Sequence, residues 1–148
     1  MKKSIIISLL LMFLLTGCIG VSSVSEETKD PEIKVEDLDY NLEVWKSTDM
    51  EGYTYILTYT NTTEFPLTRL SIGATESDQE FHRSIDNSAI VKPGETSKIS
   101  TQHLDSPPDK LDLEQINYDY IDKNGQEWSV YYDTRFEKYQ VLKVERGE

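Results

Sequence analysis

The stretch that decides the fold is EQINYDYIDKNGQEWSVYYD, residues 114–133. Apolar and polar residues alternate on both sides of Asn124-Gly125, and Asn-Gly between two such runs is the strongest short-range hairpin signal. We therefore expect an antiparallel hairpin with one buried face. The alternation places Ile116, Tyr118 and Tyr120 on one face of the first strand, and Trp128, Val130 and Tyr132 on one face of the second.

The same alternation recurs along the rest of the chain, where turn residues such as KPGE (residues 92–95) separate short β-branched and aromatic runs. Among them, YTYILTYT (residues 53–60) places Tyr53, Tyr55, Leu57 and Tyr59 on one side. We expect its tyrosines to fill the core, with an aromatic recognition face, shared with Tyr118 and Tyr120, as the alternative. Seven to nine short strands over residues 37–148 predict an all-β protein, an antiparallel immunoglobulin-like β-sandwich. The further runs are 40–45, 67–74, 81–85, 89–91, 96–100 and 137–144.

Three of these segments, YTYILTYTNTT, FPLTRLSI and IVKPGETSKI, resemble small bacterial immunoglobulin-like domains of the FxLYD kind. In that family a strand ends in an Asn-containing turn and a later PGE starts a strand. The stretch YDYID (residues 118–122) is similar to the family's aromatic signature, but it follows the PGE turn instead of preceding it. The resemblance implies the fold and no particular chemistry.

The chain begins with MKKSIIISLLLMFLLTGC, in which two lysines precede an apolar run over residues 5–15. A membrane-spanning helix needs about 20 apolar residues, so this run is too short to span a bilayer. It suits the apolar region of a secretory signal peptide, which we expect to cover residues 1–17.

Leu15-Thr16-Gly17-Cys18 resembles the bacterial lipobox, and Cys18 is the only cysteine of the chain. The resemblance implies that a diacylglyceryl group is attached to Cys18 and that cleavage occurs before it. Two acyl chains anchor a protein stably where one chain binds marginally. The expected location is therefore the extracytoplasmic face of the cell membrane, with no cysteine left to form a disulfide.

Residues 18–36 are rich in Ser, Glu and Thr, lack aromatic residues and show no sustained period. This composition predicts a disordered tether between the lipid and the sandwich. A short edge strand around Ile33 and Val35 is the alternative.

Acidic residues outnumber basic ones by 27 to 15, which gives a formal net charge of −12. Phosphate contacts from Lys and Arg dominate nucleic-acid affinity, so we expect no nucleic-acid partner. The charge favours solubility, and it is compatible with an envelope or extracellular protein, or a cationic peptide, as the partner.

Residues that could carry chemistry are few. His82 and His103 stand far apart in polar surroundings without a zinc-ligand spacing. The acidic residues around Asn124 suit a tight turn better than a calcium loop, so we expect no metal and no cofactor. Tyr131 and Tyr132 are adjacent in an expected strand and must face opposite sides. One of the two is therefore a candidate contact residue.

These observations predict a membrane-anchored lipoprotein whose sandwich is a non-enzymatic binding or interaction domain. An accessory subunit of an envelope membrane-protein complex is the first alternative. A hydrolase with an unrecognised site is the second.

Overall fold

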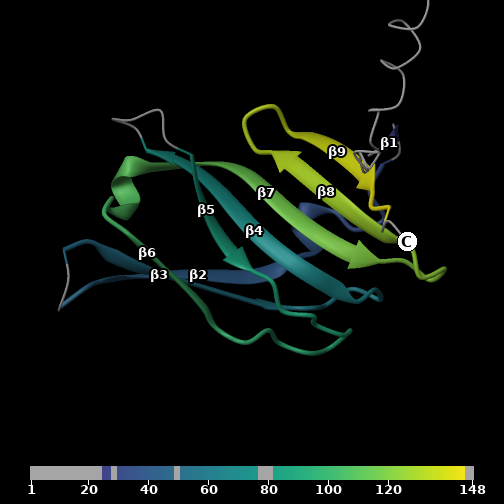
Figure 1. Cartoon of the computed structure of the whole chain (residues 1–148), viewed down its shortest axis with the longest axis horizontal. Coiled ribbons are helices and arrows are strands. Elements are labelled where there is room, and N and C mark those ends of the chain that lie inside the picture. Colours follow the sequence, from purple (N-terminus) through teal and green to yellow (C-terminus); the bar gives the residue numbers. More distant parts are fainter. Residues whose placement is uncertain (1–24, 28–29, 49–50, 77–81, 146–148) are drawn as a thin grey trace, which may run out of the picture.

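A computed structural model describes residues 25–27, 30–48, 51–76 and 82–145, and for residues 25–27 and 76 it describes the backbone alone. This part of the chain contains nine strands, two short 3-10 helices and no α-helix (Figure 1). The strands are β1 (Ser25–Glu27), β2 (Asp39–Lys46), β3 (Tyr53–Thr60), β4 (Leu67–Glu76), β5 (His82–Asn87), β6 (Ser100–Leu104), β7 (Leu111–Ile121), β8 (Glu127–Asp133) and β9 (Lys138–Lys143). The 3-10 helices are η1 (Val35–Asp37) and η2 (Pro108–Lys110).

The strands form two antiparallel sheets that pack face to face, as the sequence predicts. One sheet has three strands in the order β2-β3-β6, and the other has six in the order β1-β9-β8-β7-β4-β5. Taken in chain order from β2, the three-stranded sheet corresponds to strands A, B and E of an immunoglobulin-like sandwich, and β4-β7-β8 to C, F and G. β5 pairs with β4, and β9 and β1 extend the sheet beyond β8. The class of protein that this arrangement defines is an immunoglobulin-like β-sandwich.

The core lies between the sheets, and the alternation in the sequence identifies its residues correctly. Leu57, Tyr118 and Val130 have no exposed surface, and Tyr120 is 1% exposed. Tyr55, Tyr59, Ile116 and Trp128 are also buried, whereas Tyr53 and Tyr132 are partly buried at its margin. A core rich in tyrosine needs partners for the hydroxyl groups: Tyr55 donates to the Ser106 carbonyl and Tyr59 to the Ala89 carbonyl, at 2.9 and 2.6 Å.

The hairpin predicted at Asn124-Gly125 joins β7 and β8. The Gly125 amide donates to the Asp122 carbonyl, and only Gly125 of the turn takes the left-handed conformation, with φ of +79°. This combination is a type I turn followed by a glycine bulge, instead of the two-residue turn in which both residues have positive φ.

Two of the shorter predicted strands are displaced. Residues 89–91 contribute only an isolated bridge between Val91 and Leu67, and the strand expected at 96–100 is found at Ser100–Leu104. The side chain of Asn87 explains part of the shift, because its Nδ2 donates to the carbonyls of Leu57 and Lys98, each at 2.9 Å. A side chain thus occupies backbone acceptors that a strand ladder would otherwise use.

The predicted tether, residues 18–36, is wrong at its C-terminal end. Ile33 is 2% exposed and its carbonyl accepts a hydrogen bond from Tyr118 Oη, while Val35 N donates to Tyr139 Oη at 3.0 Å. β1 also pairs with β9. The sandwich therefore begins well before residue 37, and Ile33 and Val35 lie outside any strand. Ile33 belongs to the core although the segment around it shows no sustained apolar period, which is why the sequence pattern predicts a tether there.

Candidate functional site

A β-bulge shapes the outer face of the six-stranded sheet, the face turned away from the three-stranded sheet. Gly73 of β4 lies opposite Gln115 of β7, and Ala74 lies opposite Leu113, so Glu114 is the extra residue. A bulge of this kind changes the direction in which a side chain points. Here the side chain of Glu114 reaches Thr75 and His82 on the outer face.

Beside the bulge is a hollow of about 350 Å³, which we call the bulge hollow. Gly73 keeps it open, since a Cβ at this position would lie 3.3 Å from Gln115 Cβ and press on that side chain. The residues that line the bulge hollow are Gly73, His82, Arg83, Ser84, Glu114, Gln115, Asn117, Asp133 and Arg135.

Glu114 is the best-connected side chain of the hollow. Its Oε2 accepts a hydrogen bond from Thr75 Oγ1 at 2.7 Å, and its Oε1 accepts one from Arg135 Nη1 at 3.1 Å. Arg135 Nη2 also lies 3.5 Å from Asp133 Oδ2. These contacts fix one wall of the bulge hollow, with a guanidinium held between two carboxylates.

Asn117, a partly buried residue, forms another part of the wall and differs from the two buried asparagines, Asn61 and Asn87. The side-chain amides of Asn61 and Asn87 each donate to two backbone carbonyls at 2.7–2.9 Å. By contrast, Oδ1 of Asn117 has no hydrogen-bond partner, the only buried side-chain polar atom in this state among the described residues. An unsatisfied buried acceptor costs about 1–3 kcal/mol, so its presence calls for a reason.

Two carboxyl groups on the outer face of the six-stranded sheet, those of Asp86 and Asp119, have pKa values shifted in opposite directions. Burial alone would raise the pKa of Asp86, but hydrogen bonds from Ser71 and Ser84 and the guanidinium of Arg69, at 3.1 Å, lower it. Burial raises the pKa of Asp119, and the hydrogen bond from Ser129 Oγ at 2.6 Å opposes the rise only in part.

The two predicted contact residues lie on opposite faces of β8, as expected. Tyr132 packs against the margin of the core and its ring lies 4.6 Å from that of Tyr139, centroid to centroid. Tyr131 is half-buried on the outer face, opposite Asn117 in the pairing of β7 with β8. Tyr131 is therefore the one of the pair that stays a candidate contact residue.

His82 and His103 do not come together, because β5 and β6 belong to different sheets. His103 Nε2 lies 2.8 Å from the Glu51 carbonyl oxygen. His82 meets a hydroxyl and a carboxylate, but both face the same ring nitrogen: Nδ1 is 3.1 Å from Thr75 Oγ1 and 3.8 Å from Glu114 Oε2. A catalytic relay needs the nucleophile on one ring nitrogen and the orienting acid on the other.

The acidic residues of the last hairpin serve the turn. Asp122 Oδ1 accepts from the amides of Asn124 and Gln126 at 2.8 and 2.9 Å, and Oδ2 accepts from Trp128 Nε1 at 3.1 Å. The bond from Trp128 is the main cause that lowers the pKa of Asp122. Over the described ranges, no group of three or more His, Cys, Asp or Glu side chains is arranged to hold a metal ion.

A second hollow, of about 500 Å³, lies between η1 and the loop that follows β3. Five of its ten lining residues are acidic, and they are Glu32, Glu36, Asp37, Asp39 and Glu64. Its character differs from that of the bulge hollow, which is lined by two arginines and two carboxylates.

Cys18, the predicted lipidation site, and the predicted signal peptide lie outside the described residues. In the part that is described, no helix is long and apolar enough to cross a membrane. The chain matches no protein-family model, no curated protein and no solved structure.

Proposed function

We propose that this chain is an exported lipoprotein, anchored through Cys18 to the extracytoplasmic face of the cell membrane, whose sandwich is a non-enzymatic binding module. The observation that carries the proposal is the sequence Leu15-Thr16-Gly17-Cys18 at the end of a lysine-led apolar run. The likeness of this stretch to a lipobox covers only the anchor, so the role of the sandwich is argued from its geometry.

The position of β1 supports this arrangement. Six residues separate Cys18 from Ser25, and at about 3.5 Å per residue the chain between them reaches at most about 25 Å. β1 lies at one end of the long axis, and the hairpin of β2 and β3 ends at the other (Figure 1). A lipid on Cys18 would keep the β1 end nearest the bilayer and leave the opposite end accessible from outside.

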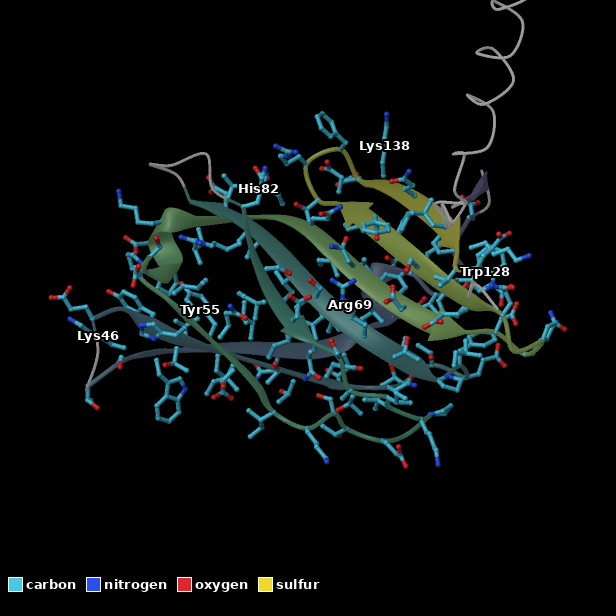
Figure 2. The ribbon with its side chains drawn as sticks, viewed as in Figure 1. Lys46, Tyr55, Arg69, His82, Trp128 and Lys138 are labelled. Carbon is cyan, nitrogen blue, oxygen red and sulfur yellow. The ribbon has the colours of Figure 1, made fainter. Side chains whose placement is uncertain are left out.

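The position of the bulge hollow supports binding from outside under this arrangement. His82, which lines it, is in the half of the molecule away from Trp128 (Figure 2), and β1 lies on the Trp128 side (Figure 1). The geometry around His82 argues for binding instead of hydrolysis, because its hydroxyl and carboxylate neighbours share one ring nitrogen.

The anchor is tested with the full chain expressed in a bacterium that processes lipoproteins. Replacing Cys18→Ala should move the protein from the membrane pellet to the soluble fraction or the medium, because the sulfur that carries the lipid is lost. Ser23→Ala is the matched control and should leave the protein in the pellet.

Mass spectrometry of the mature N-terminus completes the test. A diacylglyceryl group on Cys18, with residues 1–17 removed, is the expected result. An unmodified sulfur, or unchanged pelleting of the Cys18→Ala variant, would contradict the proposal.

A further inference from the structure

The bulge hollow has the features of a built site. Three independent features converge on it: a glycine that leaves room, a bulge that turns Glu114 outward, and an asparagine whose Oδ1 has no partner. The buried asparagines Asn61 and Asn87 both donate and accept through their side chains, so the fold does not lack partners in general. We propose that the bulge hollow binds a neutral saccharide.

The charge of the lining favours a neutral ligand. Arg83 and Arg135 balance Glu114 and Asp133, so with His82 neutral the bulge hollow carries no formal net charge. The chain as a whole carries −12, which repels polyanions, and small cations would be drawn to the acidic hollow near η1 before this one.

The chemistry of the lining favours hydroxyl groups. No apolar side chain is among the lining residues, which argues against a lipid or another apolar ligand. The guanidinium groups of the lining only donate, its carboxylates only accept, and its side-chain amides do both. A hydroxyl suits all three kinds of group, because it donates one hydrogen bond and accepts others. A sugar hydroxyl that donates to Asn117 Oδ1, after a small rotation of the side chain, removes the cost of leaving that atom unpaired.

Tyr131 supplies the second element that saccharide recognition needs. It lies directly opposite Asn117 on the outer face, and side chains in opposite positions of an antiparallel pair are about 5 Å apart. A half-buried tyrosine offers an apolar ring for the C–H face of a sugar and a polar tip for its hydroxyls. A saccharide with its hydroxyls over Gln115 and Asn117 would therefore meet this ring.

The inference rests on the proposed function, since an exported domain is one that meets extracellular saccharides. The test uses the full chain purified in a detergent without a sugar headgroup. Binding is measured to an array of neutral oligosaccharides, with anionic polysaccharides and peptides on the same array. Isolated bacterial cell wall is probed in parallel, so that wall glycan and free oligosaccharide are distinguished as sources.

The decisive variants are Asn117→Leu and Tyr131→Ala. Each should weaken binding of a neutral saccharide by about tenfold, the effect of losing one good hydrogen bond or an aromatic contact. Asn117→Leu should also leave the midpoint of thermal unfolding unchanged or raise it, because an apolar side chain of similar size replaces an unpaired acceptor. A purely structural role for Asn117 would lower that midpoint.

Asn41→Leu makes the same exchange on the exposed face of the three-stranded sheet and is the matched control. It should bind saccharide as the unaltered chain does. Binding confined to anionic polymers or peptides, absence of saccharide binding, or equal affinity in all variants would overturn the inference. These outcomes are separate from the anchor test, because membrane attachment through Cys18 is scored on its own.

Discussion

The two faces of β7 make different contributions to the molecule. Toward the core the strand presents Ile116, Tyr118 and Tyr120, which are 6%, 0% and 1% exposed. Toward the outside, the alternate residues of the same strand are Gln115, Asn117 and Asp119, all partly exposed. The inner face holds the fold together through apolar burial, whereas the outer face carries polar groups, of which Asn117 Oδ1 has no hydrogen-bond partner.

Substitutions on the outer face should therefore leave the fold intact, whereas substitutions on the inner face should destabilise it. Removing an inner side chain leaves a cavity between two sheets, and the free energy of unfolding falls accordingly. Removing an outer side chain breaks a partly solvated hydrogen bond or ion pair, which is worth little. Four measurements test this difference, from the largest expected effect to the smallest.

Tyr118→Ala should have the largest effect, a loss of about 3–5 kcal/mol in the free energy of unfolding, because it empties a fully buried aromatic site. The midpoint of thermal unfolding should fall by more than about 10 °C. Tyr131→Ala, on the outer face, should cost less than about 1 kcal/mol in urea unfolding. Equal losses for the two variants would remove the distinction between the faces.

Tyr118→Phe should cost about 1–2 kcal/mol, because the Ile33 carbonyl loses the hydroxyl that donates to it. Hydrogen exchange should become faster in residues 33–38, which this contact and Tyr139 hold on the sandwich. Tyr132→Phe is the control and should leave this exchange unchanged. Unchanged exchange in Tyr118→Phe would show that the N-terminal segment is held by other contacts.

Asp86 and Asp119 should give opposite pH dependence, since the ordinary pKa of both is 3.8 and the fold shifts it in opposite directions. The lowered pKa of Asp86 stabilises the fold above pH 3.8, and this contribution is lost as pH falls through the folded-state value. The raised pKa of Asp119 makes a contribution that is present below pH 3.8 and lost as pH rises.

Urea midpoints between pH 2.5 and 7 measure both effects. Asp86→Asn should be less stable than the unaltered chain at pH 7 and equal to it at low pH. Asp119→Asn should gain relative to the unaltered chain as pH rises. The same sign of pH dependence in the two variants would contradict the assignment.

The smallest effect is expected for the ion pair of Arg69 with Asp86, at 3.1 Å and with both side chains more than a third exposed. A double-mutant cycle of Arg69→Gln with Asp86→Asn should give a coupling below about 1 kcal/mol, and added salt should reduce it. A larger coupling free energy that persists in high salt would show that this ion pair contributes substantially to the stability of the fold.

The inner face could be predicted because burial imposes a period of two that can be counted along the chain. That is why Tyr55, Leu57, Tyr118 and Val130 are identified from the sequence. The apolar positions change phase at Glu114-Gln115, from Leu113 to Ile116, which would fit either a bulge or a break between two strands. The strand that pairs with this run lies 40 residues away, so the bulge itself could not be predicted from the local pattern. The burial of Ile33 could not be predicted for a different reason, since Ile33 and Val35 are only two alternate apolar residues in a polar segment and do not establish a period.

The sequence by itself determined the strand-rich class, the β7–β8 hairpin, the tyrosine core and the likeness of residues 15–18 to a lipobox. Each of these depends on neighbours along the chain, through alternation, turn chemistry or a short motif. Only the tertiary structure decided the position of β6, the inclusion of Ile33, and the meeting of Gly73, Glu114 and Asn117 at one hollow. Those features depend on which strands lie side by side, and sheet pairing joins residues that are distant in sequence.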